Sequence, residues 1–524
     1  MVFRSPFPDV EVPDVSLHEL LFADLGTRAD RVALVDGASG ASLTYAQLAG
    51  AIDRLAAALA ARGIGKGDVV GILSPNTPYY AVVFHGILRA GATATTINAL
   101  YTADEVAHQL ADAGARMLFT VSVLLPNAAP GAEKAGVSDV VVLDAAEGYE
   151  SLSSLLANAE PVPEVAIDPA EDVAVLPYSS GTTGRAKGVM LTHRNLVANI
   201  VQCGPLLKVG DDTKILAVLP FFHIYGMQVL MNNGLHVGAT VVTLPKFDLP
   251  EFLRVIQDHR TDRVYIAPPV AVALAKHPLV DQYDLSGIDT IFSGAAPLDV
   301  DLAAAVAQRL GCRVSQGYGM TEMSPVSHAI PDGRDDISVG TVGVIAPNME
   351  CRFVDPATGE DVGVGERGEL WCRGPNVMKG YLNNPDATAA TLDADGWLHT
   401  GDVAVIDEDG LVSIVDRVKE LIKYKGYQVP PAELEALLLT HPAIADAAVV
   451  GVRDEDGEEV PKAFVVRQPG AELDAAGVME FVASQVAPHK KVRVVEFIEA
   501  IPKSASGKIL RKDLRAREAS APAG

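Results

Sequence analysis

The stretch "SSGTTGRAKG", Ser179 to Gly188, gathers glycines, hydroxyl side chains and a lysine within ten residues. Glycines expose backbone N–H groups, and together with hydroxyls and a cation they form a concave site for phosphate. The order differs from that of a P-loop, in which lysine and a hydroxyl residue directly follow the last glycine. The flanking apolar runs "VAVLPY" (173–178) and "GVMLTH" (188–193) are typical of strands. The stretch therefore predicts a phosphate-binding loop between two strands.

Outward from this loop, the chain alternates short apolar runs with amphipathic stretches from about residue 30 to residue 330. For example, "DVVGILS" (68–74) precedes the helical pattern "YYAVVFHGILRAG" (79–91). This alternation predicts an α/β fold with parallel sheets covered on both faces. Ligands bind at the carboxyl ends of such strands. The peptides expected there are "PFFHIYG" (220–226), "SGAAPL" (293–298) and "QGYGMTE" (316–322).

The pattern changes after Thr341 into short strands interrupted by glycine, such as "GELWCRG" (368–374), which indicates a small antiparallel sheet or barrel. In "DRVKELIKYKG" (416–426), charged residues crowd between two apolar segments. Such a shift in composition predicts a domain boundary. The expected division is a large domain of residues 1–418, a smaller α+β domain of residues 419–524 and a hinge near Lys419.

Composition and charge exclude several classes of partner. Hydrophobic residues make up 49% and charged residues 21% of the 524 residues, which is typical of a folded chain. The net charge of −25 repels nucleic acid and anionic membranes. The N-terminus is unlike a signal peptide, and no run approaches the ~18 apolar residues of a membrane span. The four cysteines are far apart and form no CxxC pair, which argues against a zinc site or disulfides. We therefore expect a cytoplasmic protein with neither nucleic-acid nor membrane partners.

Four further places carry side chains suited to a nucleotide. Thr321 and Glu322 set a hydroxyl beside a carboxylate, which suits a phosphate oxygen and Mg²⁺. Asp402 in "TGD" offers a carboxylate to ribose hydroxyls, and Arg417 in "DR" a guanidinium to ribose or phosphate. Lys508 in "SASGKIL" places one cation on a glycine loop. Each motif is weak alone, because such short sequences are also common in turns.

Taken in order, these motifs resemble those of the AMP-forming adenylate-forming superfamily, which includes acyl-CoA synthetases. The resemblance spans nearly the whole chain and is greatest to 4-coumarate:CoA ligases, whose "GEICIRG"-type box is similar to "GELWCRG". It implies two parallel-sheet subdomains and a small β-barrel in the large domain, followed by a mobile C-terminal domain. The chain has Arg185 and Ala186 where plant ligases usually have Leu-Pro, and Cys372 in an apolar position of the second box.

The resemblance implies two half-reactions. A small-molecule carboxylic acid attacks the α-phosphate of ATP, giving an acyl-adenylate and pyrophosphate, and the thiol of coenzyme A then displaces AMP. Because two anions meet in the first step, the site must supply positive charge rather than a strong base. The resemblance assigns Lys508 to the carboxylate and α-phosphate, and Glu322 to Mg²⁺. It further implies that the C-terminal domain turns about Lys419, withdrawing Lys508 and bringing "KYKG" to the site.

The resemblance extends these roles to further residues. His223 shapes the carboxylate end of the pocket, while Lys423 and Gln428 serve the thioester step. The residues that bind ATP and coenzyme A are Ser179, Ser180, Gly181, Thr182, Thr183, Gly184, Lys187, Lys246, Gln316, Gly317, Tyr318, Thr321, Asp402, Arg417, Lys419, Lys425 and Gly426. The acid pocket comprises Tyr225, Val229, Gly294, Ala295, Ala296, Gly317, Pro325 and Val326. These mostly small or apolar residues predict a narrow slot, suited to 4-coumarate or a related phenylpropenoic acid.

Several alternatives remain open. His223 is otherwise a buried structural histidine, and Tyr225 a residue of the core. Val229, together with Met323 and Ser324, favours cinnamate or a medium-chain acid. The alternative functions are a medium-chain fatty acyl-CoA synthetase or luciferase-like relative, a stand-alone adenylation domain that loads a carrier protein, and a nucleotide-binding regulator without catalysis. Lys508, Glu322 and Lys187 argue against the last, because a regulator has little need of a lysine at the reacting centre.

Overall fold

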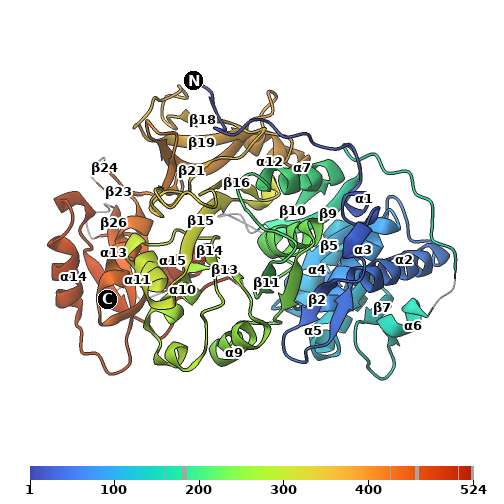
Figure 1. Ribbon diagram of the computed structural model, residues 1–524. Coiled ribbons are helices and arrows are strands. Elements are labelled where there is room, and N and C mark those ends of the chain that lie inside the picture. Colours follow the sequence, from blue (N-terminus) through green and yellow to red (C-terminus); the bar gives the residue numbers. More distant parts are fainter. Residues whose placement is uncertain (158–159, 180–185, 425–426, 455–458, 505–506, 521–524) are drawn as a thin grey trace.

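The structure is a computed structural model that describes residues 1–157, 160–179, 186–424, 427–454, 459–504 and 507–520. Two large sheets, a smaller antiparallel sheet and a C-terminal α+β unit make up the molecule (Figure 1). The smaller sheet lies above the two large ones in this view, and the C-terminal unit lies at the left. Within the described residues, no helix is both long and apolar enough to cross a membrane.

An eight-stranded sheet contains the strands on either side of the predicted phosphate loop. In spatial order its strands are β20 (Gly380–Tyr381), β10 (Lys187–Thr192), β9 (Val173–Ser179), β5 (Thr93–Ile97), β4 (Val69–Leu73), β6 (Ala115–Thr120), β7 (Asp139–Val142) and β8 (Glu150–Ser151). Neighbours from β9 to β8 are parallel, whereas β10 pairs antiparallel with both β9 and β20. The strand before and the strand after the predicted loop are thus confirmed.

A nine-stranded sheet forms the second layer. In spatial order its strands are β17 (Val344–Ile345), β16 (Val326–Ala329), β15 (Arg313–Gly319), β14 (Thr290–Ser293), β13 (Arg263–Ile266), β11 (Lys214–Ala217), β12 (Thr240–Thr243), β2 (Val32–Asp36) and β3 (Ser42–Thr44). Its central strands are parallel, as the sequence predicts, but β16, β17 and β3 run antiparallel at the edges. Antiparallel neighbours need only a short connection, so an alternating βα pattern does not reveal them.

Helices cover these sheets, and their ends follow ordinary capping chemistry. Helix α3 (Pro78–Arg89) begins after Thr77, whose hydroxyl accepts a hydrogen bond from the N–H of Tyr80 at 3.2 Å. The other helices of the large domain are α1 (Leu17–Phe22), α2 (Tyr45–Ala61), α4 (Ala103–Ala113), α5 (Leu125–Lys134), α6 (Leu152–Leu156), α7 (His193–Cys203), α8 (Asn233–Val237), α9 (Leu249–His259), α10 (Pro268–Lys276), α11 (Val300–Leu310) and α12 (Pro385–Thr391). The chain from Tyr225 forms a π-helix, η3 (Tyr225–Asn232), that continues into α8.

The small antiparallel sheet predicted after Thr341 is present. Its strands are β1 (Phe3–Arg4), β18 (Glu350–Val354), β19 (Gly368–Arg373), β21 (Leu398–Ile406) and β22 (Val412–Arg417). Side chains of β19 are alternately buried and half-buried, as expected when one face of a sheet is covered. Cys351 and Cys372 face each other across β18 and β19, and all four cysteines are free thiols.

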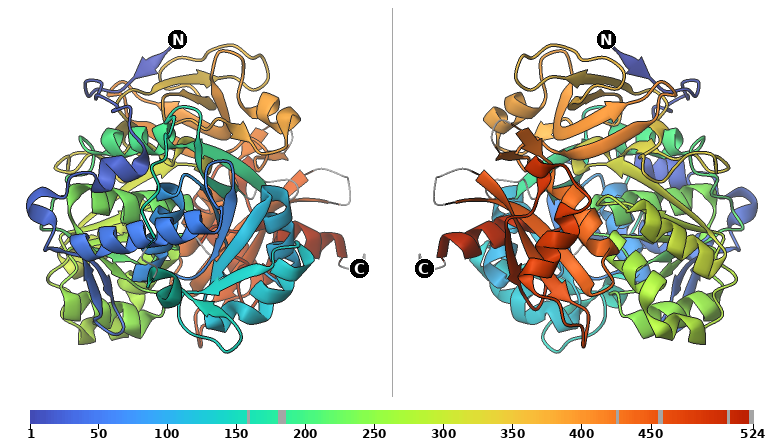
Figure 2. Two further views of the ribbon diagram at one scale, coloured as in Figure 1. Left: turned by 90° about the vertical axis from the view of Figure 1, so that its right-hand side faces the viewer. Right: turned by 90° about the vertical axis from the view of Figure 1, so that its left-hand side faces the viewer.

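The C-terminal unit packs against α10 and α11 (Figure 2, right). It contains the hairpin β23 (Ile422–Tyr424) and β24 (Tyr427–Val429), the strands β25 (Ile444–Arg453), β26 (Glu459–Arg467) and β27 (Val494–Phe497), and the helices α13 (Pro431–Thr440), α14 (Ala475–Ala483) and α15 (Arg511–Ser520). The ammonium of Lys276 in α10 donates to the carbonyl of Leu439 in α13 at 3.3 Å. This contact joins the two units at the C-terminal end of α10.

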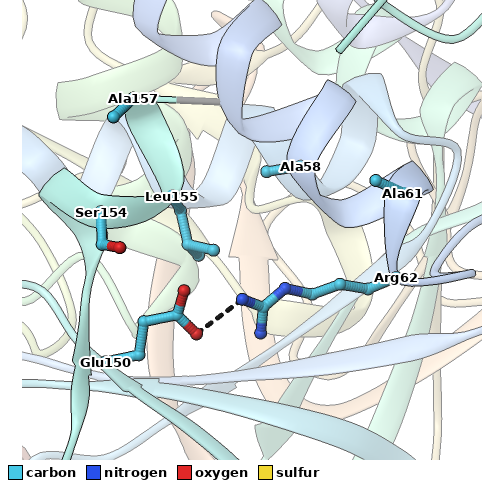
Figure 3. A pocket seen from close by; sticks show the side chains of 7 residues that line it. All are labelled: Ala58, Ala61, Arg62, Glu150, Ser154, Leu155 and Ala157. Carbon is cyan, nitrogen blue, oxygen red and sulfur yellow. Dashed lines mark hydrogen bonds and ion pairs between the residues drawn. The ribbon is translucent and has the colours of Figure 1, made fainter. Parts of the chain in front are cut away.

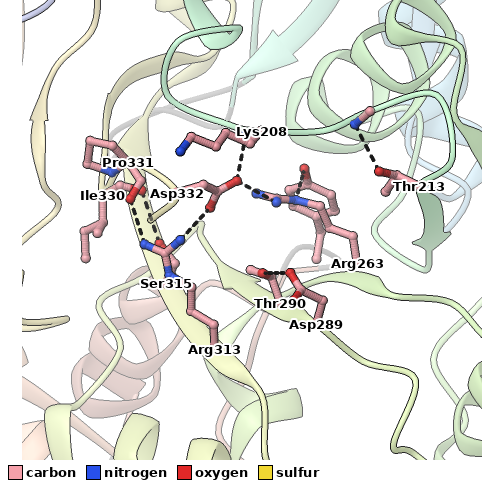
Figure 4. A network of polar contacts seen from close by, with 12 residues as sticks. Lys208, Thr213, Arg263, Asp289, Thr290, Arg313, Ser315, Ile330, Pro331 and Asp332 are labelled. Carbon is pink, nitrogen blue, oxygen red and sulfur yellow. Dashed lines mark hydrogen bonds and ion pairs between the residues drawn. The ribbon is translucent and has the colours of Figure 1, made fainter. Parts of the chain in front are cut away.

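A buried polar network ties the second sheet together at the opposite, amino ends of its strands (Figure 4). Asp332 accepts hydrogen bonds from the guanidinium of Arg263 at 2.7 Å and from that of Arg313 at 3.3 Å. It also accepts one from the N–H of Lys208 at 2.8 Å. Because it lies away from the carboxyl ends, this network fixes the sheet and leaves the site free for ligands.

Candidate active site

A cavity of about 1620 Å³ lies where the two large sheets, the small sheet and the C-terminal unit meet. The carboxyl end of β14 and the residues of β15 line one side, and β21 and β22 line another. Lys508 and the residues around it close the cavity from the C-terminal unit. The chain therefore brings segments more than 300 residues apart in sequence to one site, as the motifs require.

Most predicted site residues with described side chains line this cavity. They are Ser179, His223, Tyr225, Gly294, Ala295, Ala296, Gln316, Gly317, Tyr318, Thr321, Glu322, Pro325, Val326, Asp402, Arg417, Lys419 and Lys508. Lys187 lies beside them, with its ammonium 4.1 Å from the centre of the Tyr381 ring. Tyr381 itself lines the cavity. It was not predicted as a site residue, because no local pattern links "KGYLNN" to Glu322.

Three other predicted residues do not line the cavity within the described part of the chain. Val229 is buried inside η3, while the side chains of Lys246, after β12, and Lys423, in β23, are exposed. Gln428 lies opposite Lys423 in the hairpin. The remaining predicted residues lie outside the described residues: Ser180, Gly181, Thr182, Thr183, Gly184, Lys425 and Gly426.

Adjacent strands bring the candidate ribose-binding residues together. Asp402 of β21 and Arg417 of β22 are direct partners across the sheet, and the Nε of Arg417 lies 3.3 Å from Oδ1 of Asp402. The hydroxyl of Tyr318 donates to the other carboxylate oxygen at 2.5 Å. Burial and the neighbouring Asp402 raise the pKa of Tyr318 well above its usual value, so this hydroxyl stays a donor. The pair presents a fixed carboxylate and a guanidinium to the cavity.

Glu322 has the surroundings of a carboxylate that can hold one cation. It lies in a short 3-10 turn, Thr321–Met323, is 4% exposed, and accepts a hydrogen bond from the hydroxyl of Tyr381 at 2.8 Å. Among the described residues, no group of three His, Cys, Asp or Glu side chains gathers into a metal site. A single carboxylate nonetheless fits Mg²⁺, which takes one or two carboxylates and completes its shell with water and substrate phosphates.

Lys508 contributes a positively charged ammonium group to the cavity. Its N–H donates to the Ser504 hydroxyl at 3.1 Å, and its carbonyl accepts from the N–H of Ser504 at 2.8 Å, so the loop presents the side chain inward. Burial, and then the nearby guanidinium of Arg417, lower the pKa of Lys508 to about 8. Among the described residues, no carboxylate forms an ion pair with this desolvated ammonium, so it is suited to receive an anionic ligand.

His223 is neutral at physiological pH. Burial, and then the Lys508 charge, lower the pKa of its imidazole to about 4. Its Nδ1 accepts a hydrogen bond from the N–H of Tyr225 at 3.3 Å, which leaves the ring proton on Nε2. The imidazole therefore offers one N–H donor and no charge to this part of the cavity.

Glycines shape the slot expected to hold the acid. A Cβ added at Gly294 would lie 2.7 Å from Cε1 of Tyr225, and one at Gly317 would lie 2.8 Å from Cζ of Phe292. Ala295, which follows Gly294 and also lines the cavity, has a φ of 71°, a conformation unusual for a residue with a side chain. Sequence reasoning missed Phe292, because nothing in "TIFSGAA" distinguishes an inward phenylalanine from one in the core.

A second, smaller pocket of about 360 Å³ lies between α2 and α6 (Figure 3). Its one guanidinium, Arg62, is paired with Glu150 at 2.6 Å and with Asp139 at 3.1 Å. These ion pairs already satisfy the charges, and the rest of the wall is mostly alanine and leucine. The chemistry of the molecule therefore lies in the large cavity.

Comparisons with known proteins agree with this geometry. Models described as AMP-binding enzyme and as AMP-binding enzyme C-terminal domain match residues 21–382 and 433–508. The chain is 44% identical to 4-coumarate–CoA ligase 3 of Oryza sativa subsp. japonica, covering 99% of this chain and 95% of the relative. It is 42% identical to 4-coumarate–CoA ligase 1 of Petroselinum crispum, covering 99% and 97%. The crystal structure of an anthranilate CoA ligase in complex with anthranoyl-AMP superposes with a TM-score of 0.89 at 28% identity, covering 97% of this chain and 98% of the other.

Proposed function

Because the chain belongs to the AMP-binding enzyme family, we propose that it is an AMP-forming acid:CoA ligase that acts on 4-coumarate or a related phenylpropenoic acid. The observation that carries this proposal is the position of Lys508 in the same cavity as Glu322 and Asp402. The ammonium of Lys508 there faces both the nucleotide site and the acid slot. That arrangement suits the reaction of two anions better than an acid and base pair would.

In the first half-reaction, one carboxylate oxygen of the acid attacks the α-phosphorus of ATP, and the bond to pyrophosphate breaks. Lys508 offsets the charge that develops between the carboxylate and the phosphate. Asp402 and Arg417 fix the ribose, so the α-phosphate meets the acid at a constant position. Glu322 would hold Mg²⁺, which would supply positive charge near the pyrophosphate, and Thr321 and the loop at residues 179–188 would bind the phosphates. His223 is neutral and does not hold the attacking carboxylate in an ion pair.

In the second half-reaction, the thiol of coenzyme A attacks the acyl carbon and AMP leaves. Lys508 lines the cavity in this structure, while the side chain of Lys423 is exposed on its hairpin. This contrast supports a rotation of residues 419–524 against residues 1–418 about Lys419, which exchanges the two lysines. Gln428, opposite Lys423, would enter with it.

The acid slot supports a flat substrate. Tyr225 and Phe292 approach Gly294 and Gly317 so closely that a side chain at either glycine would collide with a ring. A planar aromatic acid fits between such walls with more contact than a flexible chain does. The names of the relatives point to the same class, since two of them are 4-coumarate–CoA ligases at 42% and 44% identity. The four free cysteines support a reducing location such as the cytoplasm.

A panel of acids tests the proposal. The purified chain is incubated with ATP, Mg²⁺ and coenzyme A, and thioester formation is measured for 4-coumarate, cinnamate, benzoate and octanoate. We expect the highest kcat/KM with 4-coumarate or cinnamate. Equal or better turnover of octanoate would contradict the substrate class. Adenylate formation without any free CoA thioester would instead indicate a domain that loads a carrier protein.

A further inference from the structure

Tyr381 stands between the phosphate loop and the candidate metal carboxylate. Its strand, β20, pairs with β10, so that Tyr381 lies opposite Val189, two residues after the lysine of the loop. On either side of Tyr381, Leu382 donates its N–H to the carbonyl of Gly188 at 2.8 Å, and Lys379 donates to that of Met190 at 3.0 Å. The backbone of Tyr381 is therefore fixed to the end of the phosphate loop.

The side chain of Tyr381 contacts two opposite charges at once. Its hydroxyl donates to Oε1 of Glu322 at 2.8 Å, while the ammonium of Lys187 lies over its ring, 4.1 Å from the centre. Tyr381 as a whole is 5% exposed. Burial, and then the Glu322 charge, raise the pKa of the hydroxyl, so it remains a donor at physiological pH.

These contacts give Lys187 and Glu322 separate parts of one side chain as partners. An ammonium and a carboxylate that contact the same buried side chain attract each other, and a direct ion pair would satisfy both. Among the described residues, Lys187 instead uses the π-face of Tyr381, and Glu322 uses its hydroxyl. A cation–π contact is weaker than a charge-assisted hydrogen bond to phosphate. The phosphates of a nucleotide can therefore replace the ring of Tyr381 as the partner of Lys187.

We propose that Tyr381 is a positioning residue that separates the phosphate-loop lysine from the metal-side carboxylate, so that each stays available to the nucleotide. The inference rests on the proposed function, because it needs ATP and a divalent cation as ligands. Without the ring, Lys187 and Glu322 pair with each other. The lysine is then no longer available to bind the phosphates, and the carboxylate is no longer available to bind the cation.

Calorimetric titration with ATP, first without metal and then with Mg²⁺, tests this role by binding rather than by turnover. In Tyr381→Leu, we expect metal-free ATP affinity to fall about tenfold, because Glu322 captures Lys187. Glu322→Gln is then added to Tyr381→Leu and, separately, to the wild-type chain. The gain in metal-free ATP affinity should be at least fivefold larger in the Tyr381→Leu background than in the wild-type background. Equal gains in both backgrounds would overturn the inference, because a merely structural tyrosine predicts no such rescue.

Tyr381→Phe provides a second, milder variant, since it keeps the ring under Lys187 and removes only the hydroxyl on Glu322. We expect metal-free affinity within twofold of wild type, and a threefold or greater loss of the enhancement that Mg²⁺ gives. Tyr45→Phe, which removes a buried hydroxyl bonded to the carbonyl of Ala239 at 2.7 Å, is the matched control and should change neither quantity. An unchanged Mg²⁺ enhancement in Tyr381→Phe would overturn the inference alone. A wild-type chain that binds no ATP under either condition would overturn the proposed function and this inference together.

Discussion

Asp402 and Arg417 are direct partners across β21 and β22, and their charged groups lie 3.3 Å apart at the wall of the cavity. The hydroxyl of Tyr318 holds the same carboxylate from the other side at 2.5 Å. A guanidinium and a phenol thus fix the direction of one buried carboxylate before any ligand arrives. In the proposed function, such preorganisation would lower the cost of binding the ribose.

Asp402→Asn is therefore expected to weaken nucleotide binding selectively. A hydrogen bond to a charged group contributes about 1.5–3 kcal/mol, which corresponds to an increase of roughly 10- to 100-fold in the KM for ATP. The KM for the acid should stay within about threefold of the wild-type value, because the proposal assigns Asp402 to the ribose and not to the acid. Steady-state kinetics with each substrate varied in turn checks this. A parallel rise in both constants would show that the carboxylate acts on the fold of the site instead.

Lys508→Ala should separate the two half-reactions. Removing the cation at the reacting centre is expected to slow pyrophosphate release at least about 100-fold. A chemically prepared acyl-adenylate should still be converted to the thioester, because the proposed rotation withdraws Lys508 from the site before that step. Pyrophosphate release and thioester formation are measured separately on the same preparation. Near-normal pyrophosphate release would refute the role of Lys508.

The lowered pKa of Lys508 predicts a pH dependence. Its ammonium is present below a pKa of about 8 and is lost as the pH rises through that value. Because adenylation needs the charge, kcat/KM for the first half-reaction should not change with pH well below the pKa. Above the pKa it should decrease, with a slope that approaches about tenfold per pH unit. Exchange of pyrophosphate into ATP measures this step alone. In Lys508→Arg, whose guanidinium stays protonated, the descending limb should vanish, and its persistence would contradict the assignment.

The network around Asp332 predicts a large effect on stability. Asp332 is 8% exposed and Arg263 is 5% exposed, so removing the carboxylate leaves a buried guanidinium without its counterion. We expect Asp332→Ala to lower the free energy of unfolding by about 3–5 kcal/mol. Asp335→Ala is the matched control, because Asp335 pairs with Arg313 but its side chain is 79% exposed. Urea denaturation should show a change below about 0.5 kcal/mol for this control.

Local patterns were enough to predict most of the sheet and the wall of the site. Buried parallel strands such as β4 and β13 are continuous apolar runs, and ligands meet their carboxyl ends, so "SGAAPL" and "QGYGMTE" could be placed at one edge. The sequence predicts that Asp402 contacts ribose hydroxyls and that Arg417 contacts ribose or phosphate. Their pairing follows from the two antiparallel strands that the glycine-interrupted pattern suggests.

Other features depend on contacts between distant segments and left no local signal. Tyr381 meets Glu322 only because β20 pairs with β10, and a two-residue strand has no periodicity to detect. Lys246 carries the same charge as Lys508, yet it is exposed after β12 whereas Lys508 is drawn into the cavity. The antiparallel edges at β3 and β16 were missed for the same reason, since strand direction depends on the connection rather than on the strand.

The central claim is that the acid is joined to AMP before coenzyme A takes it. Turnover of 4-coumarate labelled with ¹⁸O in both carboxylate oxygens, followed by mass spectrometry of the products, tests this most directly. The account predicts one ¹⁸O atom in AMP and one in the thioester, because the attacking oxygen leaves with the phosphate when the thiol displaces AMP. Unlabelled AMP, or ADP as the product, would contradict it.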